Sequence, residues 1–256
     1  MKYGLAHLSI VPMRIEKSDA SEQISQLLFG ELFKIIDPQK KWSKIKLIHD
    51  GYEGWIDNKQ ITEITAETFD RIKSNPVILS GNLLDYVSDE KHQLSTIPLG
   101  STLPLFNNNV LEINQRKFRY DGDTITGKQD KENLITTAFM YLNSPYLWGG
   151  RTPFGIDCSG FTQMIYRLNG YQISRDAYQQ ATQGEVLSFI EESEPGDLAF
   201  FDNEEGRIIH VGIIMKDNYI IHAHGKVRID RLDHSGIFNV EENKHTHKLR
   251  VIKKII

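Results

Sequence analysis

Short apolar runs, partly alternating with polar residues, occupy the chain up to about residue 125. Runs such as "LFKII", "SKIKLIH" and "EGWIDNKQI" are bounded by Gly, Asp-Pro and Asp-Gly turns, and regular spacing of such runs is typical of small β-barrels. A second cluster includes "PVILSG", "TIPLGSTLPLF" and "KFRYDGD", and "AETFDRIKSN" between the clusters indicates a short helix or linker. The pattern predicts two small β-barrels, over residues 1–65 and 66–127.

The hydrophobic period changes from about residue 128. "KENLITTAFMYLN" and "SGFTQMIYRLNG" carry apolar residues at helical spacing, and Gly170 is placed to end the second helix. Four strand-like runs follow, "LAFF", "RIIHVGIIM", "YIIHAH" and "KVRID", and the turn at residues 216–218 makes the middle two a hairpin. Helices followed by an antiparallel sheet predict an α+β domain over residues 128–256.

Composition narrows the class of protein. The chain has 256 residues, 39% hydrophobic and 25% charged, with a net charge of −4, which is ordinary for a globular protein and argues against a nucleic-acid partner. The start of the chain lacks the unbroken apolar region of a secretory signal, and no run reaches the roughly 18 apolar residues of a membrane span. We expect a cytoplasmic protein with no membrane partner, or a periplasmic one if a signal has been trimmed.

Cys158 is the only cysteine, so it forms no disulfide within the chain. It follows the turn-rich segment "GGRTPFGID" and begins a predicted helix. Unpaired N–H groups and the positive end of the helix dipole favour a thiolate there, which predicts a lowered pKa and a nucleophilic role. The alternative is a buried cysteine that fills space.

Three histidines share one parity in the predicted hairpin and are expected on one face of the sheet. His210 lies in the first strand, and His222 and His224 lie in the next. This arrangement favours a Cys–His pair with a second histidine orienting the first. Structural histidines and a three-histidine zinc site are the alternatives, although no HExxH is present; we expect neither a metal nor a cofactor.

Two more histidines, His245 and His247, lie in the charged run "EENKHTHK". The charges around them predict that both are exposed to solvent.

Five ordered motifs resemble the NlpC-type cell-wall cysteine peptidases. They are "YLWGGRTPFGIDCSGFTQMIY", "ISRDAYQQ", "EPGDLAFF", "IIHVGIIM" and "YIIHAHGKVRID", over about residues 128–256. The segment "SEQISQLLFGELFKIIDPQKKWSKIKLIHDGYEGWIDNKQ" resembles a bacterial SH3-like module. Two such modules before a papain-like catalytic domain are similar to the YkfC-like γ-D-glutamyl-L-diamino acid endopeptidases.

The resemblance implies roles for individual residues. The nucleophile falls on Cys158, the base on His210 and the third polar residue on His222, whereas the role of His224 stays open. The hydroxyl of Tyr146 would help the backbone N–H of Cys158 to hold the oxyanion; the alternative for Tyr146 is aromatic packing.

Substrate-binding roles are implied as well. Asp157 and Ser159 would line the subsite of the γ-D-glutamyl unit, unless they only cap the helix. Arg175 and Asp176 match an "RD" segment, and Asp176 would receive the ammonium of a free L-Ala, with helix capping again the alternative.

A tyrosine and an acid of the first module would also reach the substrate. The tyrosine falls on Tyr52, and Glu22 and Glu31 are both candidates for the acid.

The resemblance therefore implies a monomeric hydrolase that cleaves the γ-D-glutamyl-L-diamino acid bond of free murein peptides with an N-terminal L-Ala, in cell-wall peptide recycling. The diamino acid, diaminopimelate or Lys, stays open. Alternatives are a cell-wall amidase or acyltransferase with the same Cys–His site, or a non-catalytic peptidoglycan-binding protein.

Overall fold

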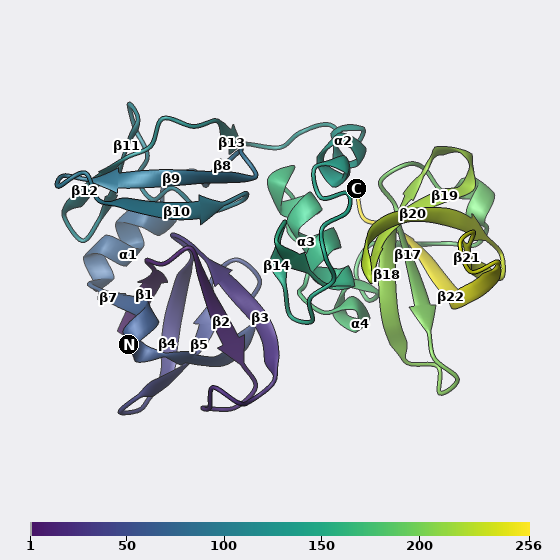
Figure 1. Cartoon of the computed structure of the whole chain (residues 1–256), viewed down its shortest axis with the longest axis horizontal. Helices are drawn as coiled ribbons and strands as arrows, with labels where there is room; N and C mark the ends of the chain where they lie inside the picture. The colour runs from purple at the N-terminus through teal and green to yellow at the C-terminus, as the bar shows by residue number, and fades with distance from the viewer. Residues whose placement is uncertain (1) are drawn as a thin grey trace. The chain divides into compact units, whose positions relative to one another are not determined.

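The chain folds into two compact units, one ending at Gly127 and the other running from Lys128 to Ile256. The computed structural model describes residues 2–256. Figure 1 shows the first unit in purple to teal and the second in teal to yellow. Each unit has its own sheet and core, and each is described by itself below.

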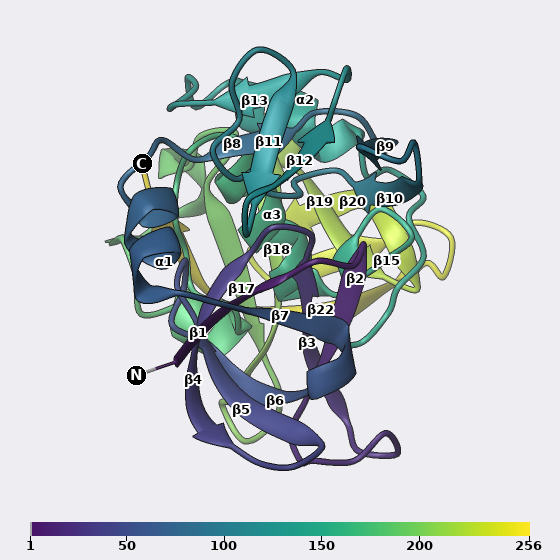
Figure 2. The same cartoon turned by 90° about the vertical axis from the view of Figure 1, so that its left-hand side faces the viewer.

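A seven-stranded antiparallel sheet forms most of the first unit, in the order β3-β2-β6-β5-β4-β1-β7. Figure 2 shows several of these strands side by side. The alternation in the sequence explains the sheet, because in β5 Ser43, Ile45 and Leu47 point inward while Lys44 and Lys46 point outward. The strands are β1 (Lys2–Ala6), β2 (Ile10–Arg14), β3 (Gln23–Leu28), β4 (Leu32–Pro38), β5 (Trp42–Leu47), β6 (Glu53–Asp57) and β7 (Ile61–Ile64), with a 3-10 turn at Asn58–Gln60.

Helix α1 (Ala66–Lys73) follows β7 and leads into the second part of this unit. Thr65 caps α1, since its side chain accepts a hydrogen bond from the backbone N–H of Thr68. Four strands then pair in the order β10-β9-β12-β11, and β13 pairs with β8. Their bounds are β8 (Ile78–Ser80), β9 (Leu84–Asp89), β10 (Leu94–Pro98), β11 (Val110–Ile113), β12 (Arg116–Arg119) and β13 (Thr124–Thr126).

The two parts of the first unit share a hydrophobic core. Leu5 and Phe29 of the first part pack in one cluster with Val87 and Leu111 of the second. The predicted division near residue 65 falls between β7 and α1, and the packing joins the two parts across it.

The second unit consists of helices and an antiparallel sheet, the predicted α+β arrangement. Its sheet runs β16-β22-β17-β18-β19-β20-β21, and β21 also pairs with β22, which closes the sheet on itself. Its elements are α2 (Asn133–Phe139), β14 (Arg151–Thr152), β15 (Gly155–Ile156), α3 (Cys158–Leu168), α4 (Ala177–Gln180), β16 (Glu185–Leu187), η2 (Ile190–Glu192), β17 (Leu198–Asp202), β18 (Ile208–Met215), η3 (Lys216–Asn218), β19 (Tyr219–His224), β20 (Lys226–Asp233), β21 (Gly236–Asn239) and β22 (Lys244–Lys254).

Helix α3 is the central helix of this unit, and it packs against β18 and β19. Every residue of α3 except Arg167 is buried. The helix ends where the sequence predicts, because Gly170 takes the left-handed φ of +78° just after the C-cap.

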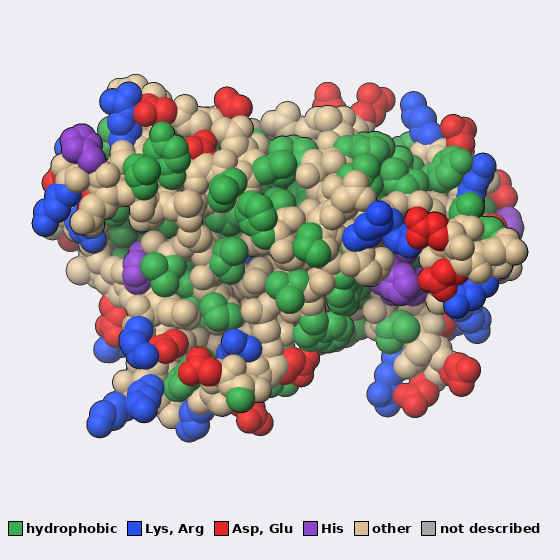
Figure 3. Space-filling view, viewed as in Figure 1, with side chains coloured by type: hydrophobic (Ala, Val, Ile, Leu, Met, Phe, Trp, Pro, Cys, Tyr) green, Lys and Arg blue, Asp and Glu red, His purple; other side chains and the backbone are tan. Residues whose placement is uncertain are grey.

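Apolar side chains are exposed around α2 and along the segment that leads into α3. Figure 3 shows hydrophobic side chains gathered on the visible surface around α2. Phe139 and Leu142 lie at the end of this helix, and Leu147, Trp148 and Phe154 lie on the segment before Cys158; all five are exposed. No helix within residues 2–256 is both long and apolar enough to cross a membrane.

Candidate active site

Cys158 is the first residue of α3, and its side chain is buried. Asp157 is the N-cap with extended backbone angles, and its carboxylate accepts a hydrogen bond from the backbone N–H of Gly160 at 2.6 Å. This cap fixes the start of α3. The backbone N–H of Val211 on β18, a strand against which α3 packs, hydrogen-bonds to the thiol of Cys158. The sequence thus predicted the position of Cys158 at a helix start correctly.

A chain of hydrogen bonds runs through three neighbouring strands beside this helix. His210 Nε2 lies 2.8 Å from His222 Nδ1, and His222 Nε2 lies 3.0 Å from Asp230 Oδ2. All three side chains are buried. The strand register pairs Gly212 with His222, which places His210 diagonal to His222 as the hairpin predicted.

The direction of these hydrogen bonds sets the tautomers of both imidazoles. Burial acts to raise the pKa of Asp230, but hydrogen bonds from His222 and Arg228 outweigh it and lower that pKa. The ionised Asp230 only accepts, so Nε2 of His222 carries the proton and its Nδ1 accepts from Nε2–H of His210. Nδ1 of His210 is therefore left unprotonated and able to accept a proton.

Sequence reasoning missed Asp230. Arg228 fixes this acid, donating from Nε to Oδ2 at 2.7 Å and from Nη2 to Oδ1 at 3.0 Å. The signal was present in the run "KVRID", because β19 pairs with β20 in a register that sets His222 opposite Arg228 and diagonal to Asp230.

The predicted lowering of the cysteine pKa is wrong for this structure. Burial, and after it the charge of Asp157, raise the pKa of Cys158 to about 12, against the backbone N–H groups of Val211 and Ser159 and the charge of Arg175, which lower it. Burial also lowers the pKa of His210 well below its usual value, and the neighbouring histidines lower it further. The helix start is enclosed, so its dipole is outweighed by the loss of hydration. Both shifts favour the neutral forms, the thiol of Cys158 and the unprotonated imidazole of His210.

Tyr146 lies close to Cys158. Its backbone N–H donates to the carbonyl of Gly225 at 3.0 Å, and its residue bridges to Ile156, two positions before Cys158. Burial raises the pKa of Tyr146, and the charges of Cys158 and Asp157 raise it further. Its hydroxyl therefore keeps its proton and is available as a hydrogen-bond donor.

Asp157, Ser159 and Arg175 form one buried network. Arg175 donates from Nη2 to Asp157 Oδ2 at 2.6 Å and from Nη1 to Asp157 Oδ1 and to the Ser159 hydroxyl, each at 3.0 Å. Asp157 also accepts from the backbone N–H of Gly149 at 2.8 Å. These contacts give all three residues a structural role at the start of α3, and their contact with substrate stays a prediction.

Asp176 follows this network as the N-cap of α4. Its backbone N–H donates to Gln179 Oε1 at 3.2 Å, so the capping interpretation describes its local geometry. Its charge also contributes, after burial, to a raised pKa of Tyr178. The role of Asp176 toward a substrate ammonium stays a prediction.

The residues predicted from the first module lie within that unit's own structure. Tyr52 is half-buried against the core of the first sheet. Glu31 is buried and accepts from the backbone N–H of Leu28 at 3.0 Å, whereas Glu22 is exposed. The choice between Glu22 and Glu31 and the contact of Tyr52 with substrate stay predictions.

Two further histidines, His224 and His247, lie next to the hydrogen-bonded chain of His210, His222 and Asp230, which is called the relay below. The predicted exposure of His247 is wrong. His224, the residue with an open role, is exposed, and its ring lies 6.3 Å from that of His222. His247 is half-buried and its ring stacks on that of His210, although the charged run predicted it in solvent. His245 is exposed as expected.

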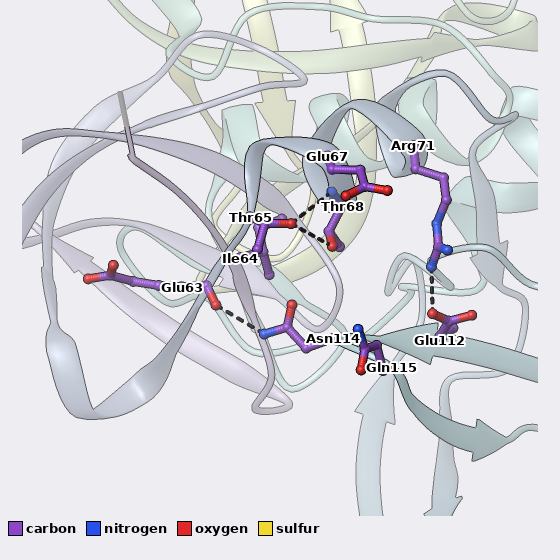
Figure 4. A pocket seen from close by; sticks show the side chains of 9 residues that line it. All are labelled: Glu63, Ile64, Thr65, Glu67, Thr68, Arg71, Glu112, Asn114 and Gln115. Carbon is purple, nitrogen blue, oxygen red and sulfur yellow. Dashed lines mark hydrogen bonds and ion pairs between the residues drawn. The ribbon is translucent and has the colours of Figure 1, made fainter.

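Among residues 2–256, no group of three or more His, Cys, Asp or Glu side chains is arranged to hold a metal ion. A pocket of about 530 Å³ lies in the first unit, but Figure 4 shows its polar groups turned toward one another. Arg71 pairs with Glu112, and Asn114 donates to the carbonyl of Glu63.

A buried thiol at the start of a helix, beside a histidine relay on an antiparallel sheet, defines a papain-like cysteine peptidase. The model of the NlpC/P60 family matches residues 143–244, and that of the bacterial dipeptidyl-peptidase SH3 domain matches residues 13–61. The chain is 31% identical, over 80% of its length and 68% of the relative, to a γ-D-glutamyl-L-lysine dipeptidyl-peptidase of Bacillus cereus. It is also 31% identical to the enzyme of the same name from Bacillus subtilis, over 78% of this chain and 71% of that one.

The chain belongs to the NlpC/P60 family of cysteine peptidases, and it carries the bacterial SH3 domain of its dipeptidyl-peptidase relatives. The fold agrees with a crystal structure of an NlpC/P60 family protein from Bacillus cereus, with a TM-score of 0.84, 22% identity and 99% coverage of both chains. The predicted fold class and the prediction of a peptidase are confirmed.

Proposed function

We propose that the protein hydrolyses the bond between γ-linked D-Glu and the following L-diamino acid in free murein peptides that begin with L-Ala. The observation that carries the proposal is the relay of His210, His222 and Asp230 beside Cys158, in a chain similar over most of its length to two γ-D-glutamyl-L-lysine dipeptidyl-peptidases. Release of small dipeptides suits recycling of wall fragments in the cytoplasm.

The reaction begins with a proton transfer. Nδ1 of His210 takes the thiol proton as Sγ of Cys158 attacks the γ-carbonyl carbon of D-Glu, because a neutral pair is more favourable at rest than an ion pair in this buried site. The backbone N–H of Cys158 and the hydroxyl of Tyr146 donate to the oxyanion that forms.

The C–N bond breaks next, and the protonated His210 gives its proton to the leaving amine of the diamino acid. Water, deprotonated by His210, then attacks the thioester; its oxygen joins the acyl group and Cys158 recovers its proton. L-Ala-γ-D-Glu leaves as the second product. His222 and Asp230 keep the proton on Nε2 of His210 throughout, so Nδ1 serves both steps.

Asp176 supplies the selectivity for a free amino terminus in this proposal. A carboxylate that pairs with the L-Ala ammonium favours free peptides over stems joined to glycan through an amide, because an amide carries no charge to pair.

The test incubates L-Ala-γ-D-Glu-diaminopimelate and L-Ala-γ-D-Glu-L-Lys with wild type and with Cys158→Ala. Liquid chromatography with mass spectrometry should detect L-Ala-γ-D-Glu from wild type only. N-acetylation of the tripeptide should abolish cleavage, whereas cleavage of acetylated or glycan-linked substrate would favour the amidase alternative. Binding of the tripeptides without cleavage would favour a non-catalytic binding protein.

A further inference from the structure

His247 lies flat against the catalytic base. The centroids of the His247 and His210 rings are 4.1 Å apart, and the ring planes differ by 26°. His247 comes from β22 and His210 from β18, with β17 between them in the sheet. Phe201 of β17 lies beside both rings, with centroid distances of 6.0 and 5.8 Å. The base is thus in contact with a side chain that the relay itself does not use.

A β-bulge in β22 turns the side chain of His247 toward His210. Ile237 pairs with His247 while Phe238 pairs with His245, so Thr246 is an extra residue. In a regular strand His245 and His247 would share a face, but an inserted residue re-aims the side chains that follow it. His245 accordingly points outward to Asp233 at 2.8 Å, and the Thr246 hydroxyl lies 2.9 Å from Nδ1 of His247.

The β-bulge at Thr246 lies one residue before His247. Bulges cost ladder pairing and occur often next to active sites, where they orient a side chain. The imidazole that this bulge turns inward is half-buried, and it touches the one residue whose orientation decides whether the thiol can lose its proton. Its position between Thr246 and the His210 ring leaves it little rotational freedom.

We propose that His247 is a positioning residue for the peptidase reaction, whose ring fixes the plane of the His210 ring so that Nδ1 faces the thiol of Cys158. Only the kinetic test of this inference rests on the proposed function. The relay holds His210 through one atom, Nε2, which leaves rotation about that hydrogen bond open. A flat ring against its face removes that freedom.

The same contact affects how readily His210 takes up a second proton. Removing His247 would expose one face of the His210 ring to water, and the smaller loss of hydration would raise the pKa of His210. The acid limb of kcat/KM should therefore move to higher pH. The ionisable groups that act on His210 are His222 and His224 on β19 and His247 on β22. Asp230 and Arg228 on β20 act in turn on His222, and Cys158 begins α3, which packs against β18.

The experiment compares His247→Ala and His247→Phe with the matched control His245→Ala, which removes an exposed histidine two positions away on the same strand. His247→Ala should lower kcat for the tripeptide about tenfold with little change in KM, since small misplacement of a catalytic group costs rate rather than binding. Its acid limb should rise by about one pH unit. His247→Phe keeps a flat ring and should retain kcat within about threefold, and His245→Ala should match wild type.

A second readout needs no substrate. NMR titration of the histidine ring signals in Cys158→Ala should show a higher pKa for His210 after His247→Ala, and no change after His245→Ala. If no tripeptide is cleaved, the proposed substrate fails while this titration still tests the inference. An unchanged kcat and an unchanged His210 titration in His247→Ala would overturn it, as would a His247→Phe variant that folds but is as impaired as His247→Ala.

Discussion

Replacing Arg175 with Met removes the charge that balances Asp157 in the interior of the second unit. The guanidinium lies 2.6 Å from the nearest carboxylate oxygen, and the two side chains are 1% and 8% exposed. Losing one partner of a buried ion pair costs about 3–5 kcal/mol, because the other charge stays buried without compensation. Met fills most of the volume of the arginine stem, so the cost reflects the charge and not a cavity.

The hydrogen bonds that Asp157 keeps in Arg175→Met determine how much stability is lost. Its carboxylate keeps the backbone N–H groups of Gly149 and Gly160, at 2.8 and 2.6 Å, so we expect the lower end of that range, about 3 kcal/mol. For a unit of this size, 1 kcal/mol corresponds to about 4 °C in Tm, which gives a decrease of about 12 °C. Adding Asp157→Asn to Arg175→Met removes the unbalanced charge and should recover part of the loss.

Differential scanning calorimetry of the full chain measures the effect. The matched control is Arg207→Met, which breaks an exposed pair with Glu205 and should shift Tm by no more than about 2 °C. If Arg175→Met melts no lower than this control, the network does not stabilise the start of α3. A raised KM with unchanged Tm would instead assign Arg175 to the substrate.

Three further predictions concern the thiol, the relay and the turn at the helix start. Because burial raises the pKa of Cys158 to about 12, the rate of alkylation by iodoacetamide should rise about tenfold per pH unit between pH 7 and 10 without a plateau; a midpoint near neutral pH would contradict this. Asp230→Ala removes the acceptor that sets the tautomer of His222, so kcat for the tripeptide should fall about a hundredfold, and a value within threefold of wild type refutes the relay. Gly160→Ala would place a Cβ 2.3 Å from the carbonyl oxygen of Gly150, so the free energy of unfolding measured in urea should decrease by about 1–3 kcal/mol; an unchanged midpoint argues against this packing.

The positions of Cys158, His210 and His222 could be predicted from the sequence. Turn formers before Cys158 and apolar residues at helical spacing after it define the start of α3, and Gly170 defines its end. The turn at residues 216–218 fixes the register of β18 and β19, so parity alone brings His210 and His222 to one face. These are local rules, and the structure follows them.

His247 could not be predicted in this way. The bulge at Thr246 shifts the register of β22 against β21, and such an insertion depends on the partner strand, which comes from elsewhere in the chain. Alternation through "KHTH" assigns His245 and His247 to the same face, whereas the structure separates them.

The ionisation of Cys158 was mispredicted for a different reason. A helix start favours a thiolate when solvent reaches it, but the sequence does not show how much structure covers the helix. The residues around Cys158 are buried from Asp157 through Tyr166, and desolvation outweighs the dipole.

The most direct test of the account is the intact mass of the protein, quenched in acid during turnover of L-Ala-γ-D-Glu-diaminopimelate. The account predicts a fraction of wild type heavier by the mass of L-Ala-γ-D-Glu less one water, located on Cys158 by peptide mapping and absent from Cys158→Ala. Cleavage of the tripeptide by Cys158→Ala, or an acyl group found on any other residue, would contradict it.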